Sequence, residues 1–450
     1  MDQVLHEAVQ LQDLQQKADL FWRLRCSNES LLLSTSGDDD EPDGITRLQP
    51  PGGLKDATPR AVRAVLDKRP DGAMGRRALP PTPHATPQPE PPPRTKPPTQ
   101  QAPRGPQEGG GVGVVLAGPG GGYRFYGEPI VKACIENGTS CIDISGEPQF
   151  LELIQLKYHE KAAEKGVYII GSSGFDSIPA DLGVIYTRNK MNGTLTAMES
   201  FLTIHSGPEG LCIHDGTWKS AIYSFGNQST LRKLRNASNL KPVPIIGPKL
   251  KRRWPISYCR ELNRYSIPFL GSDVSVVKRT QRYLHENLGE SPVQYAAYVT
   301  VGSVTSVIKL MFAGLFFLFF VRFGIGRQLL LRFPWLFSFG YFSKQGPTQT
   351  QIDASSFTLT FFGQGYSKCL GTDQKKPNMK ICTQVKGPEA GYVATSIAMV
   401  QAAMTLLNDV SDLPKAGGVF TPGAAFSRTK LIDRLNQRGI EFSVISSSEV

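Results

Sequence analysis

A run of glycines between residues 118 and 122 offers the first recognisable chemistry. It follows an apolar stretch and precedes a helix-forming one, a place where backbone amides can cradle a diphosphate in front of a helix dipole. Asp143, 25 residues beyond Gly118, lies roughly where a ribose-binding acid would stand. A G-x-G-x-x-G pattern, however, needs its third glycine where Tyr123 stands, and the next helix is predicted to begin only near Glu128. A flexible turn is therefore the favoured interpretation.

The remaining reactive side chains form no catalytic motif. His205 and His214 flank a Gly-Pro loop and are the two histidines with a chance of reaching a pocket. The seven cysteines are odd in number, scattered and without a C-x-x-C pair or a histidine at ligand spacing. We therefore predict reduced thiols in a cytosol-facing protein, no metal site, and no identifiable catalytic acid or base.

Strand and helix alternate in the first part of the sequence after residue 111. Short connections join the elements, which predicts a parallel sheet of the α/β class. The predicted elements are a strand at 112–118, a helix at 128–138, a strand at 139–147, a helix at 148–166 and a strand running into a loop at 167–183.

From about residue 195 the pattern changes. Longer apolar and polar alternations predict more antiparallel strands, and hence a second domain of the α+β class. The stretches that we interpret as strands are 196–207, 275–284, 355–365 and 378–387.

A hydrophobic segment lies between residues 301 and 342. Residues 310–321 read LMFAGLFFLFFV, and FPWLFSFGYF follows at 333–342 with aromatic residues of the type that favours membrane interfaces. Because a spanning helix needs about 20 apolar residues and basic residues stand on both flanks, a hairpin in one leaflet fits better than a single span. A core helix or a dimer interface is the alternative.

A basic stretch precedes this segment. Between Lys219 and Arg279 there are 13 basic residues against Glu261 and Asp273, an excess that equals the net charge of +11 of the whole chain. The stretch could face anionic lipid or be an ordinary solvated surface. Nucleic acid is not an expected partner, because the cluster 249–253 lacks interleaved aromatic residues.

From Tyr123 onward the sequence resembles the saccharopine dehydrogenase-like oxidoreductases. The resemblance is carried by YRFYGEPIVKACIENGTSCIDISGE and GVYIIGSSGFDSIPADLGV, and it continues to ISSSEV at the C-terminus. It implies a Rossmann-like domain that binds NAD or NADP, followed by an α+β domain. It also implies oxidoreductase activity, with some bacterial relatives resembling trans-acting enoyl reductases of lipid assembly.

The resemblance also suggests where a site would lie. Tyr123 and Gly127 are weak candidates for contact with the nicotinamide end of the cofactor. Two loops follow apolar strands, at the carboxyl ends where α/β sheets place ligands. The substrate-site candidates in them are Asp143, Gly146 and Glu147 of the D-I-S-G-E loop, and Gly174, Phe175, Asp176 and Ser177 of the G-F-D-S-I-P-A-D loop. For Asp176 and Ser177, capping of the following helix is an equally strong interpretation.

The front of the chain departs from the family pattern. The family opens with a strand, a Gly-x-x-Gly-(Phe/Tyr)-Thr-Gly turn and a helix, and residues 1–110 supply nothing of that order. We predict an amphipathic helix at 1–26 and a disordered Pro/Gly-rich segment at 27–110, which an SH3 or WW domain could bind. The predicted chain is thus an incomplete Rossmann-like parallel sheet at 111–190 and an α+β domain at 191–450 that carries the hydrophobic segment 301–342.

Two functions fit these observations. The first is an oxidoreductase of lipid-droplet or membrane surfaces, in lipid or glycolipid metabolism, with impaired cofactor binding in this chain. The second is a non-enzymatic scaffold associated with lipid. Both place the chain on a lipid surface facing the cytosol, with mitochondrial association and a homodimer as further expectations.

Overall fold

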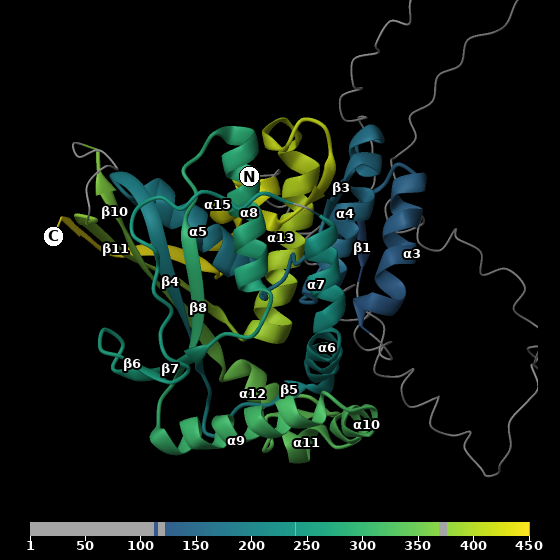
Figure 1. The fold of residues 1–450 in the computed structure, drawn as a ribbon, viewed down its shortest axis with the longest axis vertical. Coiled ribbons are helices and arrows are strands. Elements are labelled where there is room, and N and C mark those ends of the chain that lie inside the picture. The colour runs from purple at the N-terminus through teal and green to yellow at the C-terminus, as the bar shows by residue number, and fades with distance from the viewer. Residues whose placement is uncertain (1–111, 116–121, 239, 369–375, 450) are drawn as a thin grey trace, which may run out of the picture. The chain divides into compact units, whose positions relative to one another are not determined.

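The structure, a computed structural model, describes residues 112–115, 122–238, 240–368 and 376–449. The predicted N-terminal helix and the Pro/Gly-rich segment lie outside these residues, as do the six residues 116–121 after β1. Two large sheets, a small two-stranded sheet and their helices make up the described part (Figure 1).

The first sheet is parallel, as the alternation of strands and helices predicts. Its strand order is β1-β2-β3-β12, and every neighbouring pair runs in the same direction. Helices α3 and α4 make the two crossovers between the first three strands. The elements are β1 (Val112–Val115), α3 (Tyr123–Glu136), β2 (Ser140–Asp143), α4 (Pro148–Glu164), β3 (Tyr168–Ile170) and β12 (Gly418–Phe420).

Strand β12 comes from the far end of the chain. It lies inside the range 191–450 that the sequence assigns to a second domain, yet it pairs with β3. The parallel sheet is therefore completed by a segment about 250 residues away in sequence, which no local pattern indicates.

Helix α3 begins earlier than the sequence predicts. Its first residue is Tyr123, not a residue near Glu128. Proline is common in the first turn of a helix, which favours a start near Glu128, but Pro129 lies inside α3. The earlier turn is stabilised by tertiary contacts, because the buried Tyr123 ring packs on Phe150 of α4 with 5.5 Å between ring centroids.

The second sheet has seven strands in the order β13-β11-β10-β4-β8-β7-β6. All neighbouring pairs are antiparallel except β4 with β8, so the sheet is mixed. The strands are β4 (Gly193–His205), β6 (Ser257–Cys259), β7 (Arg264–Pro268), β8 (Gln294–Val301), β10 (Ser356–Ser367), β11 (Met379–Pro388) and β13 (Glu441–Glu449). The strands predicted at 196–207, 355–365 and 378–387 correspond to β4, β10 and β11.

Helices α5 (Ile178–Lys190), α8 (Asp273–Leu288) and α13 (Thr395–Asn408) lie between the two sheets (Figure 1). They bury a common apolar core with one face of the seven-stranded sheet, including Leu182, Val277 and Phe361. The strand predicted at 275–284 is wrong, because these residues lie inside α8. A ten-residue window with adjacent valines looks like a strand, whereas the buried Val276, Val277, Thr280 and Leu284 follow helical spacing.

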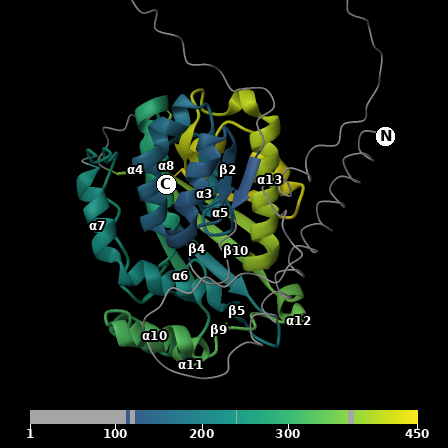
Figure 2. The same cartoon turned by 90° about the vertical axis from the view of Figure 1, so that its right-hand side faces the viewer.

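The hydrophobic segment forms a separate helical layer. α9 (Val304–Phe320), α10 (Gly324–Arg332) and α11 (Pro334–Phe337) pack beside the small parallel sheet of β5 (Ile213–His214) and β9 (Phe342–Ser343). Figures 1 and 2 both show this layer at the bottom of the view, below the large sheet. The remaining described helices are α6 (Asp215–Gly226), α7 (Gln228–Ala237), α12 (Gln349–Asp353), η1 (Ala390–Ala394), η2 (Val410–Asp412), α14 (Pro422–Phe426) and α15 (Leu431–Asn436).

Candidate functional site

The two polar loops that the sequence singles out lie side by side. One follows β2 and the other follows β3, and these strands are parallel neighbours whose carboxyl ends meet at one edge. The backbone amide of Ser173 donates a hydrogen bond to the Asp143 carbonyl over 2.6 Å, and the Ser172 hydroxyl donates to the Ser145 carbonyl over 2.7 Å. The structure thus brings the D-I-S-G-E and G-F-D-S loops into one polar layer.

Asp143 is the buried acid at the end of β2. Its Oδ1 accepts hydrogen bonds from the backbone amides of Ser145, at 2.8 Å, and Ser172, at 3.3 Å. Burial raises the pKa of this carboxyl to about 6, although both amides and the Arg279 guanidinium act in the opposite direction. A carboxyl with that pKa can exchange a proton near neutral pH.

Glu147 closes the D-I-S-G-E loop against the start of α3. Its Oε1 accepts hydrogen bonds from the Tyr123 backbone amide at 3.2 Å and from the Ser220 hydroxyl at 3.1 Å. A Cβ on Gly122 would lie 2.1 Å from the same oxygen, so residue 122 must be glycine for this approach. The first turn of α3, where the glycine run could have presented a diphosphate site, therefore already holds the protein's own carboxylate.

Tyr123 and Gly127 have clear packing roles. The Tyr123 hydroxyl accepts a hydrogen bond from the Ile144 amide at 3.3 Å, which joins α3 to the loop after β2. A Cβ on Gly127 would lie 2.4 Å from the Phe150 ring, so this glycine allows α3 and α4 to approach closely. These contacts give both residues a role in packing α3 against its neighbours.

The loop after β3 is held by α13. The Phe175 amide donates a hydrogen bond to the Thr395 hydroxyl at 3.2 Å, and a Cβ on Gly174 would lie 3.0 Å from the Thr395 methyl group. The Phe175 ring packs edge-on against Phe357 of β10, with 4.7 Å between centroids. Thr395 and Phe357 were not among the predicted site residues, because they arrive from far along the chain.

Asp176 and Ser177 precede α5, but neither side chain caps it. Ser177 occupies the N-cap position without a side-chain hydrogen bond to the helix. Its hydroxyl lies 3.2 Å from the Ser272 hydroxyl and 3.5 Å from Asp273 Oδ1, both at the start of α8. The capping interpretation is therefore wrong for Ser177. Gly146 faces the Asp176 carboxylate, which lies 3.4 Å from where a Cβ on Gly146 would be.

Further acids and one arginine complete the polar layer. Asp181 Oδ2 accepts hydrogen bonds from the Thr280 hydroxyl and the Gly423 amide, both at 2.7 Å, while its buried Oδ1 has no partner in the described part of the chain. Burial raises the pKa of Asp181 to about 6. Burial, with the negative charges of Asp176 and Asp181, raises the pKa of Asp273 well above its ordinary value.

Arg279 of α8 is the cation of this layer. Burial lowers the pKa of its guanidinium to about 10, while Glu152, Asp181 and Asp143 raise it, so the group stays charged at neutral pH. Sequence reasoning missed Arg279 because it belongs to the stretch 275–284 that was taken for a strand, and missed Asp273 because the helix that begins there was not recognised. Had α8 been recognised from its periodicity, the acid in its first turn would have been an evident candidate.

The polar layer contains very little free space. The cavity beside Asp143 and Arg279 has a volume of about 10 Å³, enough for at most one water molecule. Within the described residues, no group of three or more His, Cys, Asp or Glu side chains could hold a metal ion, and the described cysteines are free thiols. The layer can exchange protons and hold its loops in place.

His214 and His205, the two histidines that the sequence singles out, have different surroundings. His214 caps α6, because its Nδ1 accepts a hydrogen bond from the Gly216 amide at 3.1 Å. His205 lines a groove on the seven-stranded sheet, as its position beside a Gly-Pro loop suggested.

Comparison with known proteins identifies relatives over most of the chain. The saccharopine dehydrogenase-like oxidoreductase of Homo sapiens is 88% identical over 330 residues, which cover 73% of this chain and 77% of that protein. A Caenorhabditis elegans protein named lipid droplet localized protein is 37% identical over 338 residues, covering 73% of this chain and 79% of its own length.

Among solved structures, the apo histidine-tagged saccharopine dehydrogenase (L-Glu forming) of Saccharomyces cerevisiae matches with a TM-score of 0.40 and 13% identity, covering 74% of this chain and 85% of that one. No protein-family model matches the chain. The identity to the vertebrate relatives extends over about three-quarters of their length and confirms the resemblance found in the sequence. The chain belongs to the saccharopine dehydrogenase-like oxidoreductases.

Proposed function

We propose that this chain is a lipid-surface member of its family, which docks on a lipid droplet or membrane through α9, α10 and α11 and binds dinucleotide weakly. The observation that carries the proposal is the exposed apolar surface of these helices. On α9 the side chains of Leu315 and Phe319 are 58% and 59% exposed, and Ile325 and Trp335 beyond it are 77% and 65% exposed. Exposed apolar surface of this extent marks an interaction site.

The opposite face of the layer is anchored to the protein. Trp218 of α6 packs on Phe317 with 5.1 Å between ring centroids, and its indole nitrogen donates a hydrogen bond to the Leu330 carbonyl at 2.8 Å. Phe317, Val321 and Leu330 are buried in this contact. One side of the layer therefore holds a fixed orientation while the other side is presented to the surroundings.

The charges and length of the layer favour lipid as the occupant. Lys309, Arg322 and Arg332 are exposed among the apolar side chains, and each can attract an anionic head group with roughly 1 kcal/mol. α9 has 17 residues, fewer than the roughly 20 that a span needs, which suits a helix lying in the interface. One described helical stretch, Ala390–Asn408, is long and apolar enough to cross a membrane, but it packs Ala398, Ala402 and Leu406 into the core.

The basic stretch adds less to lipid attraction than its composition suggests. Arg235 pairs with Glu152 at 2.6 Å, Arg253 with Glu199 at 2.8 Å, and Lys219 with Asp215 at 3.1 Å. These cations are partly neutralised within the protein, so the apolar face of α9 to α11 carries the docking. The name of the C. elegans relative supports a droplet as the surface.

Flotation tests this docking directly. Purified full-length chain is mixed with triacylglycerol droplets coated by a phospholipid monolayer and centrifuged through a density gradient. We expect the protein to float with the droplets and to resist alkaline carbonate extraction only partly, as an interfacial helix does. Protein that stays wholly in the soluble fraction would rule out the docking.

Weak cofactor binding follows from the sequence ahead of β1. Residues 1–110 contain no Gly-x-x-Gly-(Phe/Tyr)-Thr-Gly turn, and Glu147 occupies the first-turn amide of α3. Dinucleotide affinity depends on such a turn and on the helix dipole behind it. In a thermal-shift titration with NADH and NADPH, we expect no stabilisation at micromolar concentrations. A saturating micromolar response to either nucleotide would contradict this part of the proposal.

The second candidate is a non-enzymatic lipid-associated scaffold. It is favoured by the small volume, about 10 Å³, of the cavity beside Asp143 and Arg279. Measuring droplet binding and the dinucleotide response together distinguishes the two candidate functions. Droplet binding without any dinucleotide response supports the scaffold, whereas droplet binding together with dinucleotide-dependent turnover supports the enzyme.

A further inference from the structure

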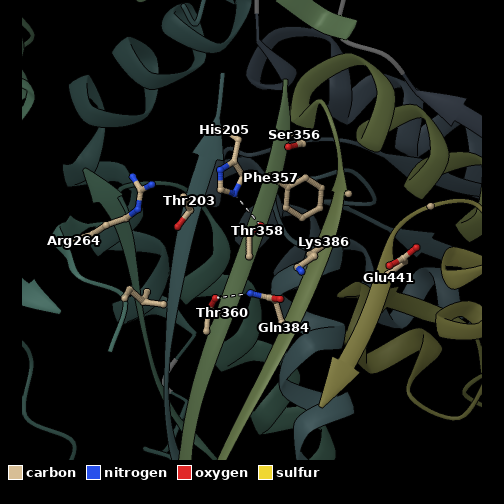
Figure 3. Close-up of a pocket in the computed structure, with 13 residues that line it drawn as sticks. Thr203, His205, Arg264, Ser356, Phe357, Thr358, Thr360, Gln384, Lys386 and Glu441 are labelled. Atoms are coloured by element: carbon tan, nitrogen blue, oxygen red, sulfur yellow. Dashed lines mark hydrogen bonds between the residues drawn. The ribbon is translucent and has the colours of Figure 1, made fainter. Parts of the chain in front are cut away.

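The face of the seven-stranded sheet that points away from α5, α8 and α13 carries an open groove. Its volume is about 620 Å³, and its walls come from β4, β7, β10, β11 and β13 (Figure 3). This volume is typical of a ligand site, whereas the cavity beside Asp143 and Arg279 in the polar layer is far smaller. The side chains that matter for its chemistry are His205, Arg264, Thr358, Gln384, Lys386 and Glu441.

The groove is positively charged. Arg264 and Lys386 form no ion pair with any residue in the described ranges, and Glu441 is the one acidic residue that lines it. Lys386 and Glu441 are partners in the strand register. Figure 3 nevertheless shows the Lys386 ammonium turned toward Thr358 and away from Glu441. Two cations and one carboxylate leave a charge of +1.

Hydrogen-bonding groups stand between these charges on a rigid scaffold. His205 Nε2 lies 3.0 Å from the Thr358 hydroxyl, and Gln384 Nε2 donates to the Thr360 hydroxyl at 3.2 Å. Thr203 is held by a contact of 2.8 Å to the Thr300 hydroxyl of β8. Since these side chains rise from paired strands, the backbone positions that carry them are fixed before a ligand binds.

The groove also lies beside the apolar layer. An Arg264 guanidinium nitrogen is 3.0 Å from where a Cβ on Gly302 would be, and α9 begins two residues later at Val304. A cationic group of the groove therefore borders the segment that we assign to lipid docking.

We propose that this groove binds a phosphate monoester, either on the head group of an anionic lipid or on a small soluble molecule. A phosphate monoester carries about −1.5 to −2 charge at pH 7 and three acceptor oxygens. Arginine binds such an anion through two parallel hydrogen bonds, lysine supplies a point charge, and the Thr358 hydroxyl and the imidazole complete the donor set. The lipid form of the proposal rests on the proposed docking of α9 to α11, whereas phosphate binding itself does not.

Phosphorus NMR line broadening with the full chain tests the site, with inorganic phosphate as the probe. Replacing both cations, Arg264→Gln with Lys386→Gln, removes two charge-assisted contacts, each of which is worth roughly tenfold in affinity. We expect the double variant to bind phosphate roughly a hundredfold more weakly. Lys386→Gln alone, at an exposed position where folding is not at risk, should show an intermediate loss.

Lys380→Gln is the matched control. Lys380 is exposed on the same strand and the same face as Lys386, roughly 20 Å away along β11. It should leave phosphate binding unchanged. An equal loss in Lys380→Gln and Lys386→Gln would show a general charge effect and overturn the proposal, as would phosphate binding that survives in the double variant.

A further experiment distinguishes a lipid head group from a soluble molecule as the source of the phosphate. Wild-type chain is floated with phosphatidylcholine vesicles that contain or lack phosphatidic acid. Tighter binding to the phosphatidic acid vesicles that is lost in the double variant identifies a lipid head group, whereas inorganic phosphate binding without that preference identifies a soluble ligand. A change of oligomeric state in the double variant, measured by light scattering, would show that the face is a protein interface and overturn the proposal.

Discussion

Replacing two exposed apolar side chains of α9, Leu315→Asp with Phe319→Asp, is expected to release the protein from lipid surfaces. Each side chain contributes about 1.5 to 3 kcal/mol when its apolar surface leaves water, so the pair accounts for more than a hundredfold in partitioning. Each aspartate adds a charge that an interface rejects. Flotation with phospholipid-coated droplets measures the loss, and the melting temperature should stay near that of the wild type because both side chains are exposed.

Leu156→Asp serves as the control for that experiment. Leu156 is an exposed leucine on α4, 50% accessible and on a different part of the molecule. The same change of chemistry there should leave droplet binding intact. The docking proposal fails if Leu156→Asp reduces flotation as strongly as the α9 variant, or if the α9 variant still floats. The α9 variant should keep its affinity for inorganic phosphate, so that failure of the docking and failure of the groove are separate results.

The buried carboxyl of Asp181 is expected to make the protein less stable as the pH rises from 4 to 7. Its pKa is about 6 in the folded state and 3.8 ordinarily. Below pH 3.8 both states are protonated, and between these values the folded state retains a proton that the unfolded state has released. Stability therefore falls with rising pH through this window, and the full cost of about 3 kcal/mol is present above pH 6.

Asp181→Asn should remove the part of the slope that Asp181 contributes, while Asp143 and Asp273, whose pKa values burial also raises, keep the remainder. The amide oxygen can accept the hydrogen bonds of Thr280 and Gly423, so the local contacts are preserved while the titration is lost. Urea unfolding at a series of pH values measures the free energy of unfolding. Asp412→Asn, at an exposed aspartate, is the control and should keep the wild-type slope. An Asp181→Asn variant whose slope matches the wild type would show that Asp181 does not titrate in this window.

The parallel sheet was predictable because its signals are local. The strand that ends at Asp143, the proline-led helix α4 and the glycine after it are all encoded within a few residues. The meeting of the D-I-S-G-E and G-F-D-S loops follows from parallel pairing of consecutive strands. What each residue does there was not predictable, since Glu147 turned out to bind the α3 amide and Ser177 the start of α8.

The missed features depend on partners that are distant in sequence. β12 joins β3, and the pKa of Asp273 depends on Asp176 and Asp181. Residues 275–284 of α8, which contain paired valines, were mistaken for a strand, so the role of Arg279 and of Asp273 just before this stretch was missed. Periodicity over the full sixteen residues of α8 would have corrected the assignment. No local sequence pattern, however, predicts that β12 pairs with β3.

The return of β12 also constrains the order in which the molecule can be built. During synthesis, β3 emerges with β2 at one side and waits for its other neighbour until residue 420 has been made. In the meantime its open edge and the apolar face of α9 are both exposed to other chains. Closing a loop of roughly 250 residues delays this step further. Completion of the parallel sheet is therefore a late event, and the nascent chain is an expected client of chaperones that shield apolar segments.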